Sequence, residues 1–275
     1  MVRRVQTKKT SRVREERRRA LILKVVLSVI GLIILVVVSA VISNLSTFRI
    51  AEYEINGLEG VNAQAVQIDA KTPLIGTYFW FWPRDCYFYL STTAVEDNLL
   101  ALIPRIQKVN VSRSGFKTLQ INIVERKPSG LWCANKDTDK CYFLDNEGLV
   151  FDRAPALSGQ LFVKYLGLLD SSIEPLGQRY LTKESFSTLT DFMSWVLASG
   201  VSVGNVTIDA DGFYRLHLPG GGEIFVSDRQ DVDRTFRNLQ TLLKEKGLLS
   251  KTVSFDTNLD YIDLRFGEKV YIKKK

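Results

Sequence analysis

An uninterrupted apolar segment near the beginning of the chain limits what this sequence can fold into. The residues from Val25 to Ile42 carry no charge, and only two serines and one glycine interrupt the run. With residues 21–23 included, the run reaches about 22 residues, which span roughly 33 Å as a helix at about 1.5 Å per residue. Because the hydrocarbon core of a bilayer is about 30 Å thick, the pattern predicts a transmembrane helix over residues 21–43.

A cleaved signal peptide is the alternative interpretation of this segment. Signal peptides have an apolar region of about 7–15 residues that ends at a cleavage site made of small residues. The run here is longer, and residues 41–46, with the sequence Val-Ile-Ser-Asn-Leu-Ser, make a poor cleavage site. A retained membrane anchor is therefore the favoured interpretation.

The charge of the chain is concentrated before the apolar segment. The net charge is +7, yet residues 1–24 hold ten of the 37 Lys and Arg and only two of the 30 Asp and Glu, so the remainder is close to neutral. A near-neutral body argues against nucleic-acid binding. The positive-inside bias predicts a cytoplasmic basic tail at 1–24 and places residues 45–275 outside the plasma (inner) membrane. The tail is favoured as a topology signal, with binding to anionic lipid of the bilayer as the alternative.

Beyond the membrane the pattern predicts an α+β protein in two parts. The first, residues 48–127, reads as a β-α-α-β-β module whose second helix is opened by a capping box of Thr93 and Glu96. The second, residues 128–275, reads as a mostly antiparallel β domain with two helices, one capped by Thr182 and one near 230–246. Its expected strands cover 131–134, 141–144, 149–151, 161–168, 203–209, 213–218, 222–227, 252–255, 259–266 and 269–272.

Two of the three cysteines flank one predicted hairpin. Cys133 and Cys141 lie eight residues apart on its two arms, where they can face each other across the strands. Disulfides form in exterior, oxidising compartments, so we expect a Cys133–Cys141 disulfide, with two free thiols as the alternative. Cys86 is left over as a buried or partly buried thiol.

An unusual aromatic stretch interrupts the first module. Eight of the twelve residues at 78–89 are aromatic, which is too many for an ordinary solvated loop. They either pack on the module's own sheet or lie in the membrane interface, where Trp and Tyr are enriched. Trp80 and Trp82 are the candidates for contact with lipid.

The sequence contains no recognisable catalytic, cofactor or metal motif. It has no G-x-S-x-G, H-E-x-x-H, P-loop or G-x-G-x-x-G pattern. His217 is the only histidine, and its place on a strand between polar positions is typical of a surface histidine. Glycines 220–222 read as a hairpin turn. We therefore expect neither an enzyme nor a cofactor.

Four short motifs carry a resemblance to a known family. They are VERKP at 124–128, FLDNEGLVF at 143–151, PALSG at 155–159 and IDLRF at 262–266. In this order, and behind a basic tail and a single membrane helix, they resemble the FtsQ/DivIB family of bacterial cell-division proteins. The β-α-α-β-β module is similar to the family's POTRA domain. The aromatic insertion at 78–89 departs from the compact family pattern.

The end of the chain is the expected partner site. Ile262, Leu264 and Phe266 alternate with polar residues and should face the core, whereas Asp263 and Arg265 share the other face and can pair at the surface. The last strand has an edge that no later strand covers, and such an edge can accept a partner strand. The resemblance implies the same place for FtsB/DivIC. Lysines 273–275 suit an acidic partner, or else only keep the edge from aggregating. The expected partner-binding residues are Asp263, Leu264, Arg265, Phe266, Val270, Tyr271 and Ile272.

The resemblance implies a non-enzymatic scaffold of the divisome. Such a protein links early and late division proteins at the septum and binds proteins of the FtsB/DivIC and FtsL type. A membrane-anchored envelope enzyme acting on peptidoglycan is the alternative, and the lack of a visible nucleophile set weighs against it. A POTRA-type chaperone for outer-membrane assembly would need several such modules or a barrel.

Overall fold

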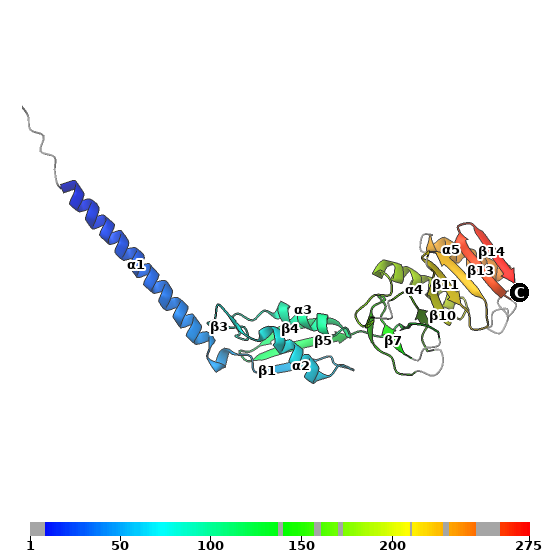
Figure 1. The fold of residues 1–275 in the computed structure, drawn as a ribbon, viewed down its shortest axis with the longest axis horizontal. Coiled ribbons are helices and arrows are strands. Elements are labelled where there is room, and N and C mark those ends of the chain that lie inside the picture. The colour runs from blue at the N-terminus through cyan, green and yellow to red at the C-terminus, as the bar shows by residue number, and fades with distance from the viewer. Residues whose placement is uncertain are drawn as a thin grey trace, which may run out of the picture. The chain divides into compact units, whose positions relative to one another are not determined.

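The chain folds into two units (Figure 1). The computed structural model describes residues 9–136, 140–156, 161–169, 173–209, 211–227, 231–245 and 259–275. The first unit comprises the chain up to residue 102 together with residues 108–123, and the second comprises residues 103–107 together with 124–275. The mixed α+β architecture agrees with the prediction.

A single long helix, α1 (Lys9–Ser43), opens the described chain. Its segment Arg14–Ser43 is long and apolar enough to cross a membrane, and none of its apolar window is buried against the rest of the protein. The hydroxyls of Ser28 and Ser39 donate to carbonyls one turn earlier, so these polar groups are satisfied without water. The helix starts twelve residues before the apolar run predicted from residue 21, so part of the basic tail is helical.

The first unit contains the predicted β-α-α-β-β module. Its three strands form a sheet in the order β1-β5-β4, in which β1 and β5 are parallel. The module's core is made of buried aliphatic side chains that include Val66, Leu99 and Ile121. Its elements are β1 (Glu52–Asn56), α2 (Ala63–Lys71), α3 (Thr92–Leu102), β4 (Ile106–Ser114) and β5 (Thr118–Glu125). Two 3₁₀ turns and a short hairpin complete the unit: η1 (Ser46–Phe48), η2 (Thr72–Leu74), β2 (Thr77–Tyr78) and β3 (Trp82–Pro83).

The predicted capping box of α3 is wrong. The helix begins at Thr92, and the hydroxyl of Ser91, two residues before the predicted cap, accepts a hydrogen bond from the amide of Ala94 at 3.2 Å. Glu96 instead accepts from the amide of Val111 in β4 at 2.7 Å. Three consecutive hydroxyl residues occupy positions 91–93 at the start of this helix, so the local pattern does not say which one caps it. The Glu96 carboxylate is bound by β4, the strand that follows this helix.

The second unit is built on a nine-stranded mixed sheet. The strand order is β14-β13-β12-β11-β10-β9-β6-β7-β8. Five of the eight neighbouring pairs are antiparallel, and three, β12 with β13, β10 with β9 and β6 with β9, are parallel. The strands are β6 (Gly130–Cys133), β7 (Cys141–Leu144), β8 (Val150–Arg153), β9 (Lys164–Leu166), β10 (Asn205–Ile208), β11 (Phe213–His217), β12 (Glu223–Ser227), β13 (Leu259–Phe266) and β14 (Lys269–Lys274).

Two helices contribute to the core of the second unit. They are α4 (Lys183–Ala198), capped as predicted by the hydroxyl of Thr182, and α5 (Val232–Glu245). Their apolar side chains, such as Phe186 and Leu239, share one buried cluster with the strand residues Ile224 and Ile262. The strand predicted at 252–255 and residues 157–159 of the PALSG motif lie outside the described residues.

A buried carboxylate lies at the start of the second unit. Asp145, only 1% exposed, accepts hydrogen bonds from the amides of Glu147 and Leu149 and from the guanidinium of Arg126. The Nε atom of Arg126 also donates to the carbonyl of Pro104 at 3.0 Å. The VERKP and FLDNEGLVF motifs are therefore joined by a buried ion pair.

Replacing Arg126 by Met should destabilise the second unit strongly. The substitution leaves the Asp145 charge buried without its cation, which costs about 3 to 5 kcal/mol of unfolding free energy. Denaturant unfolding of the full chain, followed by the fluorescence of buried Trp132, measures the change. Arg153→Ala is the control, because the pair it forms with Glu174 is exposed on both sides and such pairs contribute only about 0.2 to 1 kcal/mol. Equal losses of unfolding free energy for the two substitutions would contradict the role of Arg126 as the partner of buried Asp145.

Candidate functional site

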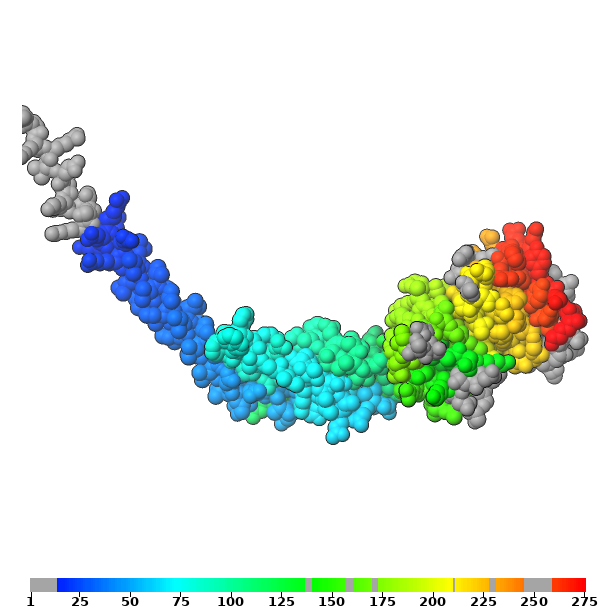
Figure 2. Space-filling view, in the orientation of Figure 1, coloured from blue at the N-terminus to red at the C-terminus, as the bar shows by residue number. Residues whose placement is uncertain are grey.

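Strand β14 forms one end of the nine-stranded sheet. It pairs with β13 in an antiparallel ladder in which Ile262 faces Ile272 and Asp263 faces Tyr271. No second strand pairs with β14 within the described part of the chain. In Figure 2 the red C-terminal segment lies at the surface of the second unit. Backbone N–H and C=O groups on the outer edge of such a strand are available to another chain.

The inward face of this strand pair is apolar. Ile262 and Leu264 are buried as predicted, and Val270 and Ile272 are partly buried against the same cluster. Phe266 was predicted to face the core, and this is wrong, because its side chain is 56% exposed. The register shifts between Asp263 and Phe266, and such an irregularity breaks the in–out alternation of a strand.

The outward face carries an ion pair covered by aromatic rings. Arg265 donates to Asp263 through Nε at 2.9 Å and through a terminal nitrogen at 2.6 Å. Its guanidinium carbon lies 4.9 Å from the ring centroids of Phe213 and Phe225. Burial works to raise the pKa of Asp263, but the hydrogen bonds and charge of Arg265 outweigh it, and the pKa lies below its ordinary value. The predicted pair forms, although Asp263 is buried rather than at the surface.

The edge itself combines positive charge with exposed rings. Tyr271 is 49% exposed, and its ring contacts that of exposed Phe266 edge-on at 5.4 Å. Lys273 pairs with Asp260 at 2.8 Å, and lysines 269, 274 and 275 are also exposed. This edge can therefore offer backbone pairing, two aromatic rings and a cationic end to an acidic segment.

A hydrogen-bonded row on three adjacent strands was missed from the sequence. The hydroxyl of Thr207 lies 2.9 Å from Nε2 of His217, and Nδ1 of His217 lies 3.0 Å from a carboxylate oxygen of Glu223. His217 is thus partnered on both nitrogens instead of being a plain surface residue. Sequence reasoning could not find the row, because it depends on the register of β10, β11 and β12.

The electrostatics of this row favour a neutral imidazole. Partial burial lowers the pKa of His217, and the charges of Arg215 and Lys136 lower it further, whereas Glu223 acts in the opposite direction. The order hydroxyl, imidazole and carboxylate is the one that nucleophilic catalysis uses. However, the strand around Thr207 is paired with β9 on one side and β11 on the other. Ladder pairing does not supply the pair of free N–H groups that an oxyanion hole requires.

Comparison with known proteins identifies the first module. Residues 48–126 match the family model described as "POTRA domain, FtsQ-type". These residues are an FtsQ-type POTRA domain. The match confirms the resemblance to the FtsQ/DivIB family of bacterial cell-division proteins. Among solved structures, the chain is similar to the major extracytoplasmic domain of the trans isomer of the cell division protein DivIB from Geobacillus stearothermophilus, with 10% identity, a TM-score of 0.28, and coverage of 46% of this chain and 98% of that chain. No curated protein matches the chain.

The POTRA domain carries the two predicted interface tryptophans on its inserted hairpin. Trp80 is 90% exposed, whereas Trp82 is partly buried and hydrogen-bonded to Ser39 of α1. Cys86, in the same insertion, is a buried free thiol. Within the described ranges, no group of three His, Cys, Asp or Glu side chains is arranged to hold a metal ion.

The hairpin that follows the POTRA domain should contain a disulfide in the mature protein. Cys133 and Cys141 are directly paired across β6 and β7, with a Cα–Cα separation of 4.4 Å, and their sulfur atoms are bonded. Intact mass measured without reduction should be two hydrogens below the reduced mass. Cys133→Ser should lower the unfolding free energy by about 2 to 3 kcal/mol, because the cross-link restricts the unfolded chain. Cys86→Ser is the control that should leave the mass difference unchanged. Two free thiols in protein from an oxidising compartment would contradict the pairing.

Proposed function

We propose that this protein is a non-enzymatic scaffold of the bacterial divisome that links early and late division proteins at the septum. The observation that carries the proposal is the FtsQ-type POTRA domain at 48–126, which follows a helix able to cross a membrane. The terminal strand β14, which has no second partner strand among the described residues, supports a partner surface at the C-terminus. A scaffold needs an anchor and a binding surface, and the chain offers both.

The proposed topology has a cytoplasmic N-terminus and places residues 45–275 outside. The basic residues before the apolar run support this orientation, because Lys and Arg remain on the cytoplasmic side. The Cys133–Cys141 bond supports it as well, since disulfides persist in oxidising compartments outside the cytoplasm. A reporter active only outside the membrane should therefore work when it is fused after Lys275.

The proposed partner is a membrane protein of the FtsB/DivIC type, together with FtsL, and it binds by adding a strand to β14. Strand addition relies on main-chain hydrogen bonds, with side-chain contacts for specificity. Phe266 and Tyr271 offer rings beside the edge, and the lysines of β14 attract acidic residues. The helices α4 and α5 contribute their apolar side chains to the core, and β14 is one of the two terminal strands of the sheet among the described residues.

A proline in β14 should abolish partner binding while the unit stays folded, because proline removes a backbone donor. Successive N–H groups of a strand point to opposite sides. Tyr271→Pro and Ile272→Pro are therefore prepared as two separate single variants. One of them removes an outward donor, and the other disturbs the pairing with β13. The informative variant is the one that keeps the parent melting temperature.

Binding to the purified extracytoplasmic part of the FtsB/DivIC-type partner is then measured for that variant. Tyr271→Ala, which keeps the N–H group, is the matched control and should retain most of the affinity. If the folded proline variant binds as tightly as the parent, the partner site lies elsewhere, with the POTRA domain as the next place to test.

The row of Thr207, His217 and Glu223 favours a second candidate function, an envelope enzyme acting on peptidoglycan. Depletion of the protein followed by complementation separates the two functions. Under the scaffold proposal, depletion blocks septation and gives filaments, and Thr207→Val restores division as well as the parent does. Valine has nearly the shape of threonine but no nucleophilic oxygen. Failure of a folded Thr207→Val variant, with loss of wall cross-linking, would support the enzyme and contradict the scaffold.

A further inference from the structure

The inserted hairpin of the first unit ends in exposed aromatic side chains. Strands β2 and β3 pair Tyr78 with Trp82, and the tip between them consists of Phe79, Trp80 and Phe81. These three side chains are 82%, 90% and 58% exposed. Contiguous exposed apolar surface of this kind marks a site of contact with protein or membrane.

The backbone of the tip is unusual. Phe79 and Trp80 have φ values of 46° and 69°, in the left-handed region that bulky residues rarely adopt. Such strain persists where the surrounding structure imposes it, and it concentrates at functional sites. Burial of these rings within the described chain does not offset the strain, because both are almost fully exposed. The conformation leaves two large rings exposed, although Phe79 also contacts the ring of Trp82 edge-on at 6.2 Å.

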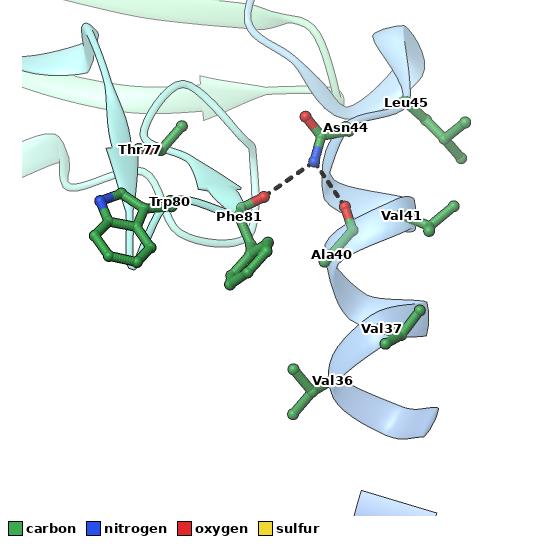
Figure 3. A pocket seen from close by; sticks show the side chains of 9 residues that line it. All are labelled: Val36, Val37, Ala40, Val41, Asn44, Leu45, Thr77, Trp80 and Phe81. Carbon is green, nitrogen blue, oxygen red and sulfur yellow. Dashed lines mark hydrogen bonds between the residues drawn. The ribbon is translucent and has the colours of Figure 1, made fainter. Parts of the chain in front are cut away.

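The hairpin is fixed to the end of the long helix. Asn44, the residue that follows α1, donates through Nδ2 to the carbonyl of Phe81 at 3.0 Å and to that of Ala40 at 2.8 Å. The indole nitrogen of Trp82 donates to the hydroxyl of Ser39 at 3.1 Å. These bonds hold the tip beside α1, as Figure 3 shows for Asn44 and Phe81.

A groove of about 600 Å³ separates the tip from the helix. Figure 3 shows the rings of Trp80 and Phe81 on the hairpin side and the last turns of α1 opposite. The groove is lined mainly by apolar side chains, namely Val36, Val37, Ala40 and Val41 of α1 and Trp80 and Phe81 of the hairpin.

The depth of the groove in a bilayer follows from the helix. Its α1 wall belongs to the segment long and apolar enough to span a membrane. Ser39 and Val36 lie three and six residues before Ile42, or about 4.5 and 9 Å along the axis at the rise of a helix. The groove therefore lies at the C-terminal boundary of the hydrocarbon layer. Trp and Tyr are enriched at this level of membranes.

We propose that the hairpin 77–83 inserts its tip into the lipid interface beside α1 and that the groove holds a phospholipid acyl chain. Lipid is the occupant because four groove residues belong to the membrane-spanning segment itself and cannot face water once it is inserted. Arg84 at the base of the hairpin is exposed and lies 5.2 Å from the ring of Tyr78, where its charge suits a headgroup phosphate. The insertion thus fixes the POTRA domain at the membrane surface independently of any protein partner.

Brominated lipids test the insertion directly, since bromine quenches tryptophan fluorescence on contact. The full chain is placed as a single copy in nanodiscs of phosphatidylcholine brominated either near the headgroup or near the chain end. Shallow bromines should quench the parent more than deep ones do. The quenching should fall in Trp80→Phe and nearly vanish in Trp80→Phe/Trp82→Phe.

Trp195→Phe is the matched control, because Trp195 lies in the second unit against Phe236 and its loss should leave the lipid quenching unchanged. An unchanged melting temperature shows that each variant is folded. Equal quenching of the parent and the double variant would place the tip in water and overturn the proposal. Quenching of the parent only by deep bromines would overturn the interfacial position. Neither result depends on the divisome assignment.

Discussion

The second unit depends on the buried ion pair between Asp145 and Arg126. The charge of Asp145 is held by two backbone amides and by Arg126, which also binds the carbonyl of Pro104. A buried charge is tolerated only when it is paired and hydrogen-bonded. The pair therefore fixes the segment 103–107 and the turn after β7 in one arrangement. The first strand of the large sheet, β6, starts four residues after Arg126, so the ion pair lies next to the point where the chain enters the sheet.

At one end of the sheet, β14 has β13 as its single partner strand among the described residues. The apolar side chains of α4 and α5 enter the core, while the opposite side of β11 to β13 carries Arg215, Phe225 and Arg265 in cation–ring contacts. These contacts cover the buried Asp263 and leave Tyr271 and the lysines of β14 exposed. The edge is thus charged and carries exposed aromatic side chains, which suit the proposed addition of a partner strand.

The first unit differs, because it exposes apolar side chains along α1 and at the tip of the inserted hairpin. The rings of Phe79 and Trp80 and the last turns of α1 are unfavourable in water but suit a lipid interface. Hydrogen bonds from Asn44 and Trp82 tie the hairpin to the helix. The proposed anchoring and the proposed partner binding therefore use separate units with opposite chemistry.

The sequence by itself determined the features that depend on local pattern. A charge-free run defines the membrane helix, the β-α-α-β-β order follows from changes in periodicity, and Thr182 marks the start of α4. The tertiary structure decided what depends on long-range pairing. A register shift exposes Phe266, and the pairing of β10 to β12 assembles Thr207, His217 and Glu223. The amide of Val111 in β4 binds Glu96, which was expected to cap its own helix. Local patterns state which residues alternate along a segment. The register and the identity of the neighbouring strand arise only when segments distant in sequence compete for the same hydrogen bonds and the same buried space.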